Sequence, residues 1–339
     1  MFGSRPHAVV SGNLGRRRWR LTRMRQTVGM DIAMIGLGKM GANMAERLLR
    51  GGHRVVAFDR SAEAVAASVG KGAIGVGSLE ELAATLAAPR IIWIMVPAGA
   101  PTQSTVDSLE TILSSGDIVI DGGNSNYKQT QARAAQLAEK GITLLDSGTS
   151  GGVWGLANGY CLMIGGAKAA YDHCEPIFAT LAPPDGQFHV DDKPGAGHFV
   201  KMVHNGIEYA MMQAYGEGLE IIEKSPFTVD QTKLTSVWGQ GSVVRSWLLE
   251  LLADFLIKDP GLSSLTAYVD DSGEGRWTVD AAVEFGAPAY AITAALYARF
   301  ASRDANAYGL RVLSALRNSF GGHAVKAATQ AVPASSPTA

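Results

Sequence analysis

Cysteine is scarce in this chain: its 339 residues include only Cys161 and Cys174. The two are too far apart in the sequence to form a CxxC redox pair or a metal-binding knuckle. The seven histidines form no cluster of metal ligands either. The sequence therefore predicts a protein without a metal site, located in a reducing compartment, the cytoplasm.

Long hydrophobic runs and a basic surplus are also lacking. Although 47% of the residues are hydrophobic, no uninterrupted apolar run is long enough to cross a bilayer. The net charge is -1, and residues 1–29 hold seven arginines and no acid, so subtracting their +7 leaves -8 for the remainder. Such a remainder has no excess of cations to neutralise nucleic-acid phosphates. We therefore predict no membrane and no nucleic acid as partners.

The two ends of the chain differ in composition from the segment between them. Residues 1–29 are predicted to be a basic disordered extension or the result of an upstream start, with a transit peptide as the alternative. Residues 327–339, rich in Ala, Ser and Pro, are predicted to be a disordered tail. The segment between them is long enough for two domains, each with its own core.

Short apolar runs alternate with helical segments over the first half of that segment. The runs of strand length are DIAMIG, RVVAFD, IIWIMV, DIVIDGG, ITLLD, YCLMIGG and QFHV. Strands that alternate with helices predict βαβ units and a parallel sheet, and nearly continuous apolar strands predict that both faces are covered. We expect an α/β Rossmann-like domain with a mostly parallel, doubly wound sheet at residues 30–193. From residue 194 to residue 326 the strand signals stop and an all-α domain is predicted.

A glycine-rich turn follows the first predicted strand. Gly36, Gly38 and Gly41 have the G-x-G-x-x-G spacing with which the N-terminus of a helix binds a pyrophosphate. Asp59 ends the second strand, 23 residues after Gly36, where an acid hydrogen-bonds the adenosine ribose. Asp59 repels a 2′-phosphate whereas the adjacent Arg60 attracts one, so NAD is the predicted cofactor and NADP remains possible. A tight turn without a nucleotide is the other interpretation of the glycines.

Four further segments lie where a doubly wound sheet binds its ligands, beyond the carboxyl ends of strands. The first three carry, in chain order, Val96 and Pro97, then Asn124, then Ser150, Gly151 and Gly152. Each segment alone is typical of an ordinary turn. Together they predict a lined cleft, in which the paired glycines allow close backbone approach to an anionic substrate.

The fourth segment, GHFVKMVHNGIEY, sets polar groups into an otherwise apolar helix. Lys201, Asn205 and Glu208 fall at i, i+4 and i+7 on one stripe, with His204 and Tyr209 beside it. An ion-pair network, or a lysine that extends to solvent, is one interpretation. Next to a dinucleotide-binding domain, the stripe is better explained as an acid/base pair at the cleft, with the lysine as base.

At these residues the chain resembles the decarboxylating 6-phosphogluconate dehydrogenases of the β-hydroxyacid dehydrogenase superfamily. The resemblance runs from Met30 to about Lys326, and the motifs that match in order are GLGKMGANM, DGGNSNY, GTSGGVWG, KMVHNGIEY, GEGRWT and RNSFGGH. The whole superfamily shares the glycine-rich turn, the SGG loop and a lysine with an asparagine four residues on. His204 and Asn205 followed by Glu208 and Tyr209, with arginines downstream, indicate the 6-phosphogluconate branch.

The resemblance implies oxidation and decarboxylation of 6-phosphogluconate to ribulose 5-phosphate and CO2, without a metal. Lys201 would take the proton of the C3 hydroxyl as hydride leaves for the nicotinamide, and Glu208 would protonate C1 of the enediol. Implied contacts to the sugar acid are Asn124, Ser150, Gly151, Gly152, His204 and Asn205; those to its phosphate are Tyr209, Arg276, Arg299 and Arg317, with His323 completing the site. The expected cofactor contacts are Gly36, Leu37, Gly38, Met40, Gly41, Asp59, Arg60, Val96, Pro97 and Asn124.

The chain departs from the family pattern in three ways. Long members continue into a duplicated helical domain, whereas this chain is a short form. In long members the segment that matches Arg317 and His323 enters the partner subunit's site, so the resemblance implies a homodimer or homotetramer. NADP-using relatives have Asn-Arg-Thr where this chain has Asp59, Arg60 and Ser61, which again favours NAD. Arg276 stands where many members carry lysine, a change that retains phosphate affinity but alters reach.

Two other functions remain open from the sequence. A related enzyme that reduces a small β-hydroxy acid such as tartronate semialdehyde would accept a phosphate-free substrate, and the distal arginines would be dispensable. A non-catalytic NAD-binding sensor would bind the cofactor without turnover. The presence of both Lys201 and Glu208 argues against the sensor.

Overall fold

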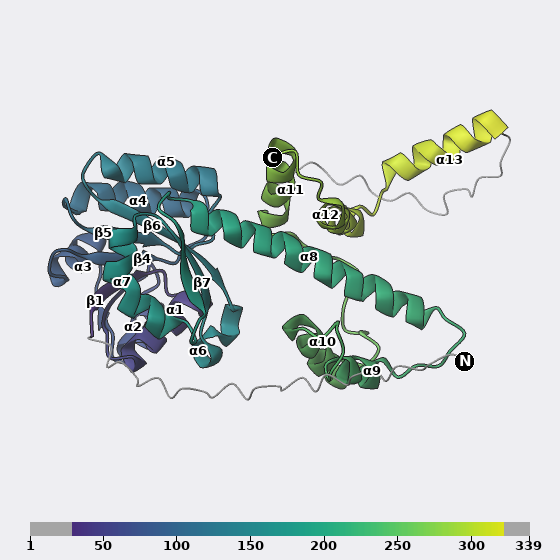
Figure 1. Ribbon diagram of the computed structural model, residues 1–339, viewed down its shortest axis with the longest axis horizontal. Helices are drawn as coiled ribbons and strands as arrows, with labels where there is room; N and C mark the ends of the chain where they lie inside the picture. The colour runs from purple at the N-terminus through teal and green to yellow at the C-terminus, as the bar shows by residue number, and fades with distance from the viewer. Residues whose placement is uncertain (1–28, 322–339) are drawn as a thin grey trace, which may run out of the picture.

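The computed structural model describes residues 29–321, with side chains to residue 319. Its first part is one eight-stranded sheet in the order β3-β2-β1-β4-β5-β6-β7-β8 (Figure 1). The strands are β1 (Asp31–Ile35), β2 (Arg54–Phe58), β3 (Ile74–Gly75), β4 (Ile91–Ile94), β5 (Ile118–Asp121), β6 (Thr143–Ser150), β7 (Cys161–Gly165) and β8 (Gln187–Asp191). Neighbouring strands are parallel except β6 and β7, which are antiparallel. The predicted α/β class with a mostly parallel sheet is confirmed.

Helices cover both faces of this sheet. One face carries α1 (Lys39–Arg50), α2 (Ala62–Val69) and α7 (Lys168–Leu181); the other carries α3 (Leu79–Thr85), α4 (Ala100–Ile112) and α5 (Tyr127–Ala138). Successive residues of β1 belong to different cores: Ile32 packs on the first face and Ala33 on the second, both with no exposed area. Because neighbouring residues of a strand point to opposite faces, two covered faces require a continuous apolar run.

The segment after Asp146 differs from the prediction. The sequence predicts a loop there, whereas β6 continues to Ser150, because its second half pairs with the antiparallel strand β7. The turn begins only at Gly151 and leads into the short helices η1 (Gly152–Trp154) and α6 (Gly155–Asn158). The two-residue strand β3 was also missed, since it is too short to give a pattern.

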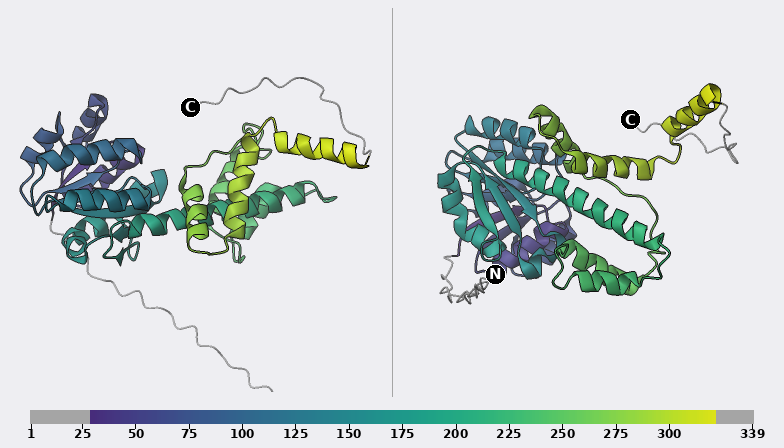
Figure 2. Two further views of the ribbon diagram at one scale, coloured as in Figure 1. Left: turned by 90° about the horizontal axis from the view of Figure 1, so that it is seen from above. Right: turned by 45° about the vertical axis from the view of Figure 1, so that its right-hand side comes forward.

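The second part of the chain is helical, as predicted. Its elements are α8 (Ala196–Glu223), α9 (Gln231–Trp238), α10 (Trp247–Lys258), α11 (Glu274–Glu284), α12 (Tyr290–Arg303) and α13 (Tyr308–Gly321). The 28-residue α8 runs from the sheet through the helical part, with α11 and α12 on one side and α9 and α10 on the other (Figures 1 and 2). Among the described residues no helix has the length and apolar character needed to span a membrane. The boundary between residues 193 and 194 remains a prediction.

Candidate functional site

The glycine-rich turn connects β1 to α1 and leaves the start of that helix open. Gly36 has φ +93°, and a Cβ there would lie 2.4 Å from the Met95 carbonyl oxygen. A Cβ on Gly41 would lie 1.9 Å from the Gly36 carbonyl oxygen, whereas one on Gly38 would meet nothing within 4 Å. The first turn of α1 holds no acid. The residues present therefore fit a pyrophosphate, because the free N–H groups and the helix dipole favour an anion.

Gly41 and Gly38 give opposite predictions for alanine substitution. Gly41→Ala is expected to destabilise the fold by about 1–3 kcal/mol, since the new methyl group overlaps backbone. Gly38→Ala is expected to leave the unfolding temperature unchanged but to weaken cofactor binding about tenfold, roughly 1.4 kcal/mol. Thermal unfolding and an NADH fluorescence titration of both variants test this. Equal behaviour of the two variants in both measurements would show that Gly38 does not face the cofactor.

The carboxylate of Asp59 lies directly beside this turn, at the carboxyl end of β2. Its Oδ2 atom accepts the Leu37 N–H at 2.7 Å, and its Oδ1 atom accepts the Ser61 N–H at 2.8 Å. The adjacent Arg60 is exposed. The acid predicted to bind a ribose is thus fixed by two backbone donors at the edge of the turn.

The end of the neighbouring strand β4 completes this side of the sheet. A Cβ on Gly36 would lie 3.0 Å from Val96 Cγ1, so the loop that follows β4 touches the glycine turn. The carbonyl oxygen of Pro97 in the same loop accepts the Thr102 hydroxyl at 2.9 Å, which fixes the loop to α4. The predicted cofactor residues of β1, β2 and β4 therefore meet at one edge.

Asn124 joins the loop after β5 to the end of β6. It has φ +51°, and its side-chain amide exchanges two hydrogen bonds with the Thr149 backbone, at 3.1 and 2.9 Å. Ser150, the residue after Thr149, places its hydroxyl oxygen 3.5 Å from His204 Nε2. Gly151 follows with φ +124°, a conformation that favours glycine. Residues from three separate predicted motifs therefore converge at this point.

The N-terminus of α8 packs closely on β6. The Asp146 carboxylate accepts the Gly195 N–H at 2.6 Å and the His198 N–H at 2.7 Å, and so caps the helix from the neighbouring strand. Burial raises the pKa of Asp146. A Cβ on Gly148 would lie only 2.4 Å from the Cβ of Lys201. This close packing determines where the lysine stands relative to the sheet.

Lys201 is buried in a network that extends to α11. Its side chain is 6% exposed, and its ammonium donates to Asn205 Oδ1 and lies 3.6 Å from Glu274 Oε1. The Asn205 amide in turn donates to the second Glu274 oxygen. Glu274 lies in the matched GEGRWT motif but is not among the residues predicted from the sequence. An acid between two glycines at the start of a helix is the signal that was available.

A cavity of about 670 Å³ opens on the other side of the lysine. Among its lining residues are predicted site residues from both parts of the chain: Met40, Asn124, Ser150, Gly151, Gly152, Lys201, His204 and Glu208. His204 Nδ1 lies 2.9 Å from Asn205 Oδ1 and 4.0 Å from Glu208 Oε2. The Glu208 side chain is 36% exposed. A buried amine and an accessible carboxylate therefore face one chamber, which suits proton transfer at two points of one ligand.

Three of the four predicted phosphate ligands form a second cluster, against α11 and α12: Tyr209, Arg276 and Arg299. The Arg299 guanidinium lies 3.6 Å from the centre of the Tyr209 ring. The Tyr209 hydroxyl accepts the Ser272 N–H at 2.9 Å. Arg276 donates two hydrogen bonds to Asp271, at 2.8 and 2.9 Å, which lowers the pKa of that carboxyl. None of these side chains lines the cavity described above.

The fourth predicted phosphate ligand, Arg317, is not brought to this cluster. Arg317 lies on α13, which projects away from the rest of the helical part (Figures 1 and 2). His323 lies outside the described residues. The structure of one chain thus leaves the predicted phosphate site without Arg317.

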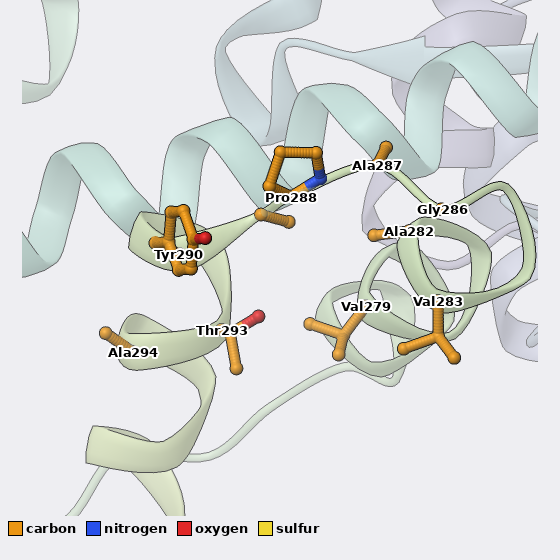
Figure 3. Close-up of a pocket in the computed structure, with 10 residues that line it drawn as sticks. Val279, Ala282, Val283, Gly286, Ala287, Pro288, Tyr290, Thr293 and Ala294 are labelled. Carbon is orange, nitrogen blue, oxygen red and sulfur yellow. The ribbon is translucent and has the colours of Figure 1, made fainter.

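A different hollow, of about 740 Å³, lies where the end of α11 meets the start of α12 (Figure 3). Apart from the hydroxyls of Tyr290 and Thr293, its labelled side chains are apolar (Figure 3). It contains none of the predicted site residues. We therefore assign the functional site to the chamber beside Lys201.

Fold and site together define a dinucleotide-dependent dehydrogenase, with the candidate chamber between the edge of its sheet and a helical part. Residues 31–190 match the model described as the NAD binding domain of 6-phosphogluconate dehydrogenase. Residues 197–332 match the model of the C-terminal domain of the same enzyme. The chain belongs to the family of 6-phosphogluconate dehydrogenases, which confirms the resemblance noted in its motifs.

Individual relatives agree with this assignment. The NAD(+)-dependent, decarboxylating 6-phosphogluconate dehydrogenase of Haloferax volcanii is 43% identical over 298 residues, which cover 87% of this chain and 98% of that protein. The NADP(+)-dependent, decarboxylating enzyme of Bacillus subtilis is 37% identical over 293 residues, 80% of this chain and 61% of that protein. The structure of Plasmodium falciparum 6-phosphogluconate dehydrogenase is similar with a TM-score of 0.74 and 28% identity, covering 90% of this chain and 67% of that one.

Proposed function

We propose that this chain converts 6-phospho-D-gluconate to D-ribulose 5-phosphate and CO2 with reduction of NAD. Membership of the family and NAD(P) dependence of its relatives support the reaction. The observation that carries the proposal is that Lys201 and Glu208 open onto one chamber with Met40 of the dinucleotide turn. An amine and a carboxylate beside a nicotinamide are the groups that the reaction requires.

The proposed roles follow the order of bond changes. When bound, the oxidised nicotinamide supplies the acceptor for the hydride of C3. Lys201, as the neutral amine, takes the proton of the C3 hydroxyl and becomes an ammonium. The 3-keto acid then loses CO2 because the ketone accepts the electron pair of the broken bond, and the ammonium returns its proton to that oxygen. Glu208, in its protonated form, then delivers a proton to C1 of the resulting enediol, which is the former C2 of the substrate. The neutral amine of Lys201 takes the proton of the adjacent enediol hydroxyl, so that the ketone of ribulose 5-phosphate forms.

Substrate recognition is proposed for the groups around these two residues. Asn124, Ser150, Gly151, Gly152, His204 and Asn205 would contact the sugar acid, and Tyr209, Arg276 and Arg299 its phosphate. Arg317 would act from a second copy of the chain. The side chains of Leu310, Leu313 and Leu316 on α13 are 56–68% exposed, which suits a helix that packs on another subunit. A homodimer or homotetramer is therefore part of the proposal.

We propose NAD rather than NADP as the preferred cofactor. The Asp59 carboxylate lies beside the glycine turn, so its charge opposes a 2′-phosphate. Asp59→Ser is expected to raise the ratio of kcat/KM for NADP over NAD about tenfold or more, since the repulsion disappears while Arg60 remains. Initial rates with both cofactors measure this ratio. The matched change Asp31→Ser, at the end of β1 that lies away from the glycine turn, should leave the ratio unaltered. An unchanged ratio in Asp59→Ser would contradict the assignment.

A comparison of substrates tests the proposed function. The rate of NADH formation is measured with 6-phosphogluconate and with small unphosphorylated β-hydroxy acids at equal concentrations. We expect turnover of the phosphorylated substrate and little of the others. Turnover of a small β-hydroxy acid alone would instead support the related reductase, and cofactor binding without any turnover would support a sensor.

A further inference from the structure

Glu274, the first residue of α11, is an acid buried beside the amine of the chamber. Its side chain is 9% exposed, and its Oε1 atom lies 3.6 Å from Lys201 Nζ. Its Oε2 atom accepts hydrogen bonds from the Asn205 amide and from the Ser272 hydroxyl, the latter at 2.9 Å. One carboxylate oxygen is therefore held by two donors, while the other faces the lysine.

The helix that carries Glu274 is itself fixed against α8. The Thr278 hydroxyl, one turn further on, donates to the Met202 carbonyl oxygen at 2.7 Å. Gly275 packs so closely on Tyr209 that a Cβ there would lie 2.5 Å from the ring. Because both contacts are direct, α11 cannot move along α8 without breaking them. The position of the carboxylate is thus set by the packing of two helices.

The other titratable groups around the lysine are directed elsewhere. On α8, His204 and Glu208 face the chamber, and His198 pairs with the Thr130 hydroxyl of α5 at 2.8 Å. On β6, Asp146 is occupied by the N–H groups of the α8 N-terminus. Within residues 29–321, Glu274 supplies the one ion pair that Lys201 makes. A buried ammonium without such a partner would be costly, so the pair balances the charge of this region.

We propose that Glu274 is the counter-ion of Lys201 and a positioning residue for the oxidation step. This inference rests on the proposed function, in which Lys201 takes the C3 hydroxyl proton. The amine becomes an ammonium at that moment, and the fixed carboxylate stabilises the new charge without reorganisation. Glu274 remains a carboxylate throughout, so the proton resides on Lys201 until it is returned to the substrate oxygen.

The variant Glu274→Gln removes the charge and retains the shape. In the pH range where its kcat no longer changes with pH, here called the plateau, kcat is expected to fall on the order of tenfold to a hundredfold, because the lysine becomes a weaker base. Its KM for 6-phosphogluconate should change little, since the residue faces the amine and not the chamber. Without the anion the ammonium is disfavoured, so the neutral amine persists to lower pH. The acidic limb of the kcat/KM profile should therefore move to lower pH by about one unit.

Two further variants separate charge from structure. Glu284→Gln removes an acid at the exposed end of the same helix, where it pairs with Lys128, and should leave both the plateau and the limb unchanged. Glu274→Asp keeps the charge but withdraws it by one methylene group, so an intermediate plateau and a smaller shift of the limb are expected. This second variant also provides the test if Glu274→Gln is recovered unfolded.

The outcomes distinguish this inference from the proposed function. The unaltered protein is assayed with 6-phosphogluconate in the same series, so its failure to react would reject the proposed function itself. If it reacts but Glu274→Gln lowers the plateau with no movement of the limb, Glu274 has only a structural role. Wild-type behaviour of Glu274→Gln or Glu274→Asp in both quantities would also overturn the counter-ion role.

Discussion

Replacing Lys201 with methionine is expected to lower kcat roughly a hundredfold to ten-thousandfold, the range for loss of a general base. Methionine keeps an apolar stem against Gly148 of β6 but has no group that accepts the C3 hydroxyl proton. Without that proton transfer, hydride leaves C3 only slowly, so the formation of reduced cofactor should be slow even in the first turnover. Stopped-flow absorbance of NADH at saturating substrate measures this directly.

The control for this variant comes from the same helix. Lys224→Met, at the exposed C-terminal end of α8, should retain full activity. Lys201→Met also leaves Glu274 buried without its partner, so the free energy of unfolding should decrease by about 3–5 kcal/mol. The double variant with Glu274→Gln is expected to recover stability but not activity. Retention of rapid NADH formation by Lys201→Met would exclude this lysine as the base.

Replacing Glu208 with glutamine is predicted to give the second-largest loss, also roughly a hundredfold or more in steady-state kcat. Its effect should fall on a different step, because a glutamine cannot protonate C1 of the enediol, the former C2 of the substrate, after CO2 has left. Oxidation at C3 depends on Lys201 and should continue. We therefore expect a rapid burst of about one NADH per site, followed by slow turnover.

Glu217 provides the matched control for this second variant. It lies further along α8, where its carboxylate accepts a hydrogen bond from Gln213 at 2.8 Å on the exposed surface. Glu217→Gln should therefore show normal steady-state rates. If Glu208→Gln lost the burst together with the turnover, its role would lie in binding or oxidation rather than in protonation of C1.

Local spacing was sufficient to predict much of the fold and part of the site arrangement. The glycine turn, Asp59 and the polar stripe of α8 are each defined within one strand-turn-helix unit or one helix, so periodicity places them. The structure refines the stripe: Asn205 faces α11, Glu208 faces the chamber, and Lys201 lies between them. Residues at i, i+4 and i+7 cover an arc of the helix surface rather than one line along it. The sequence does not say which neighbouring element packs against each side of that arc.

The features that the sequence did not predict depend on packing between distant segments. Glu274 becomes a partner of Lys201 only because α11 docks on α8 through Thr278. The second half of β6 is a strand only because β7 pairs with it. Arg317 has no local pattern that specifies which subunit it serves. Such contacts are determined by tertiary structure, which overrides local preference.

The most direct test of the central claim is the amount of CO2 released for each NADH formed from 6-phosphogluconate by the full chain. Both products are measured in the same samples over the initial phase of the reaction. We predict equal amounts, because every oxidation at C3 produces a 3-keto acid that decarboxylates in the same site. NADH formation without CO2, or no NADH with this substrate, would contradict the assignment of Lys201 and Glu208 to an oxidative decarboxylation.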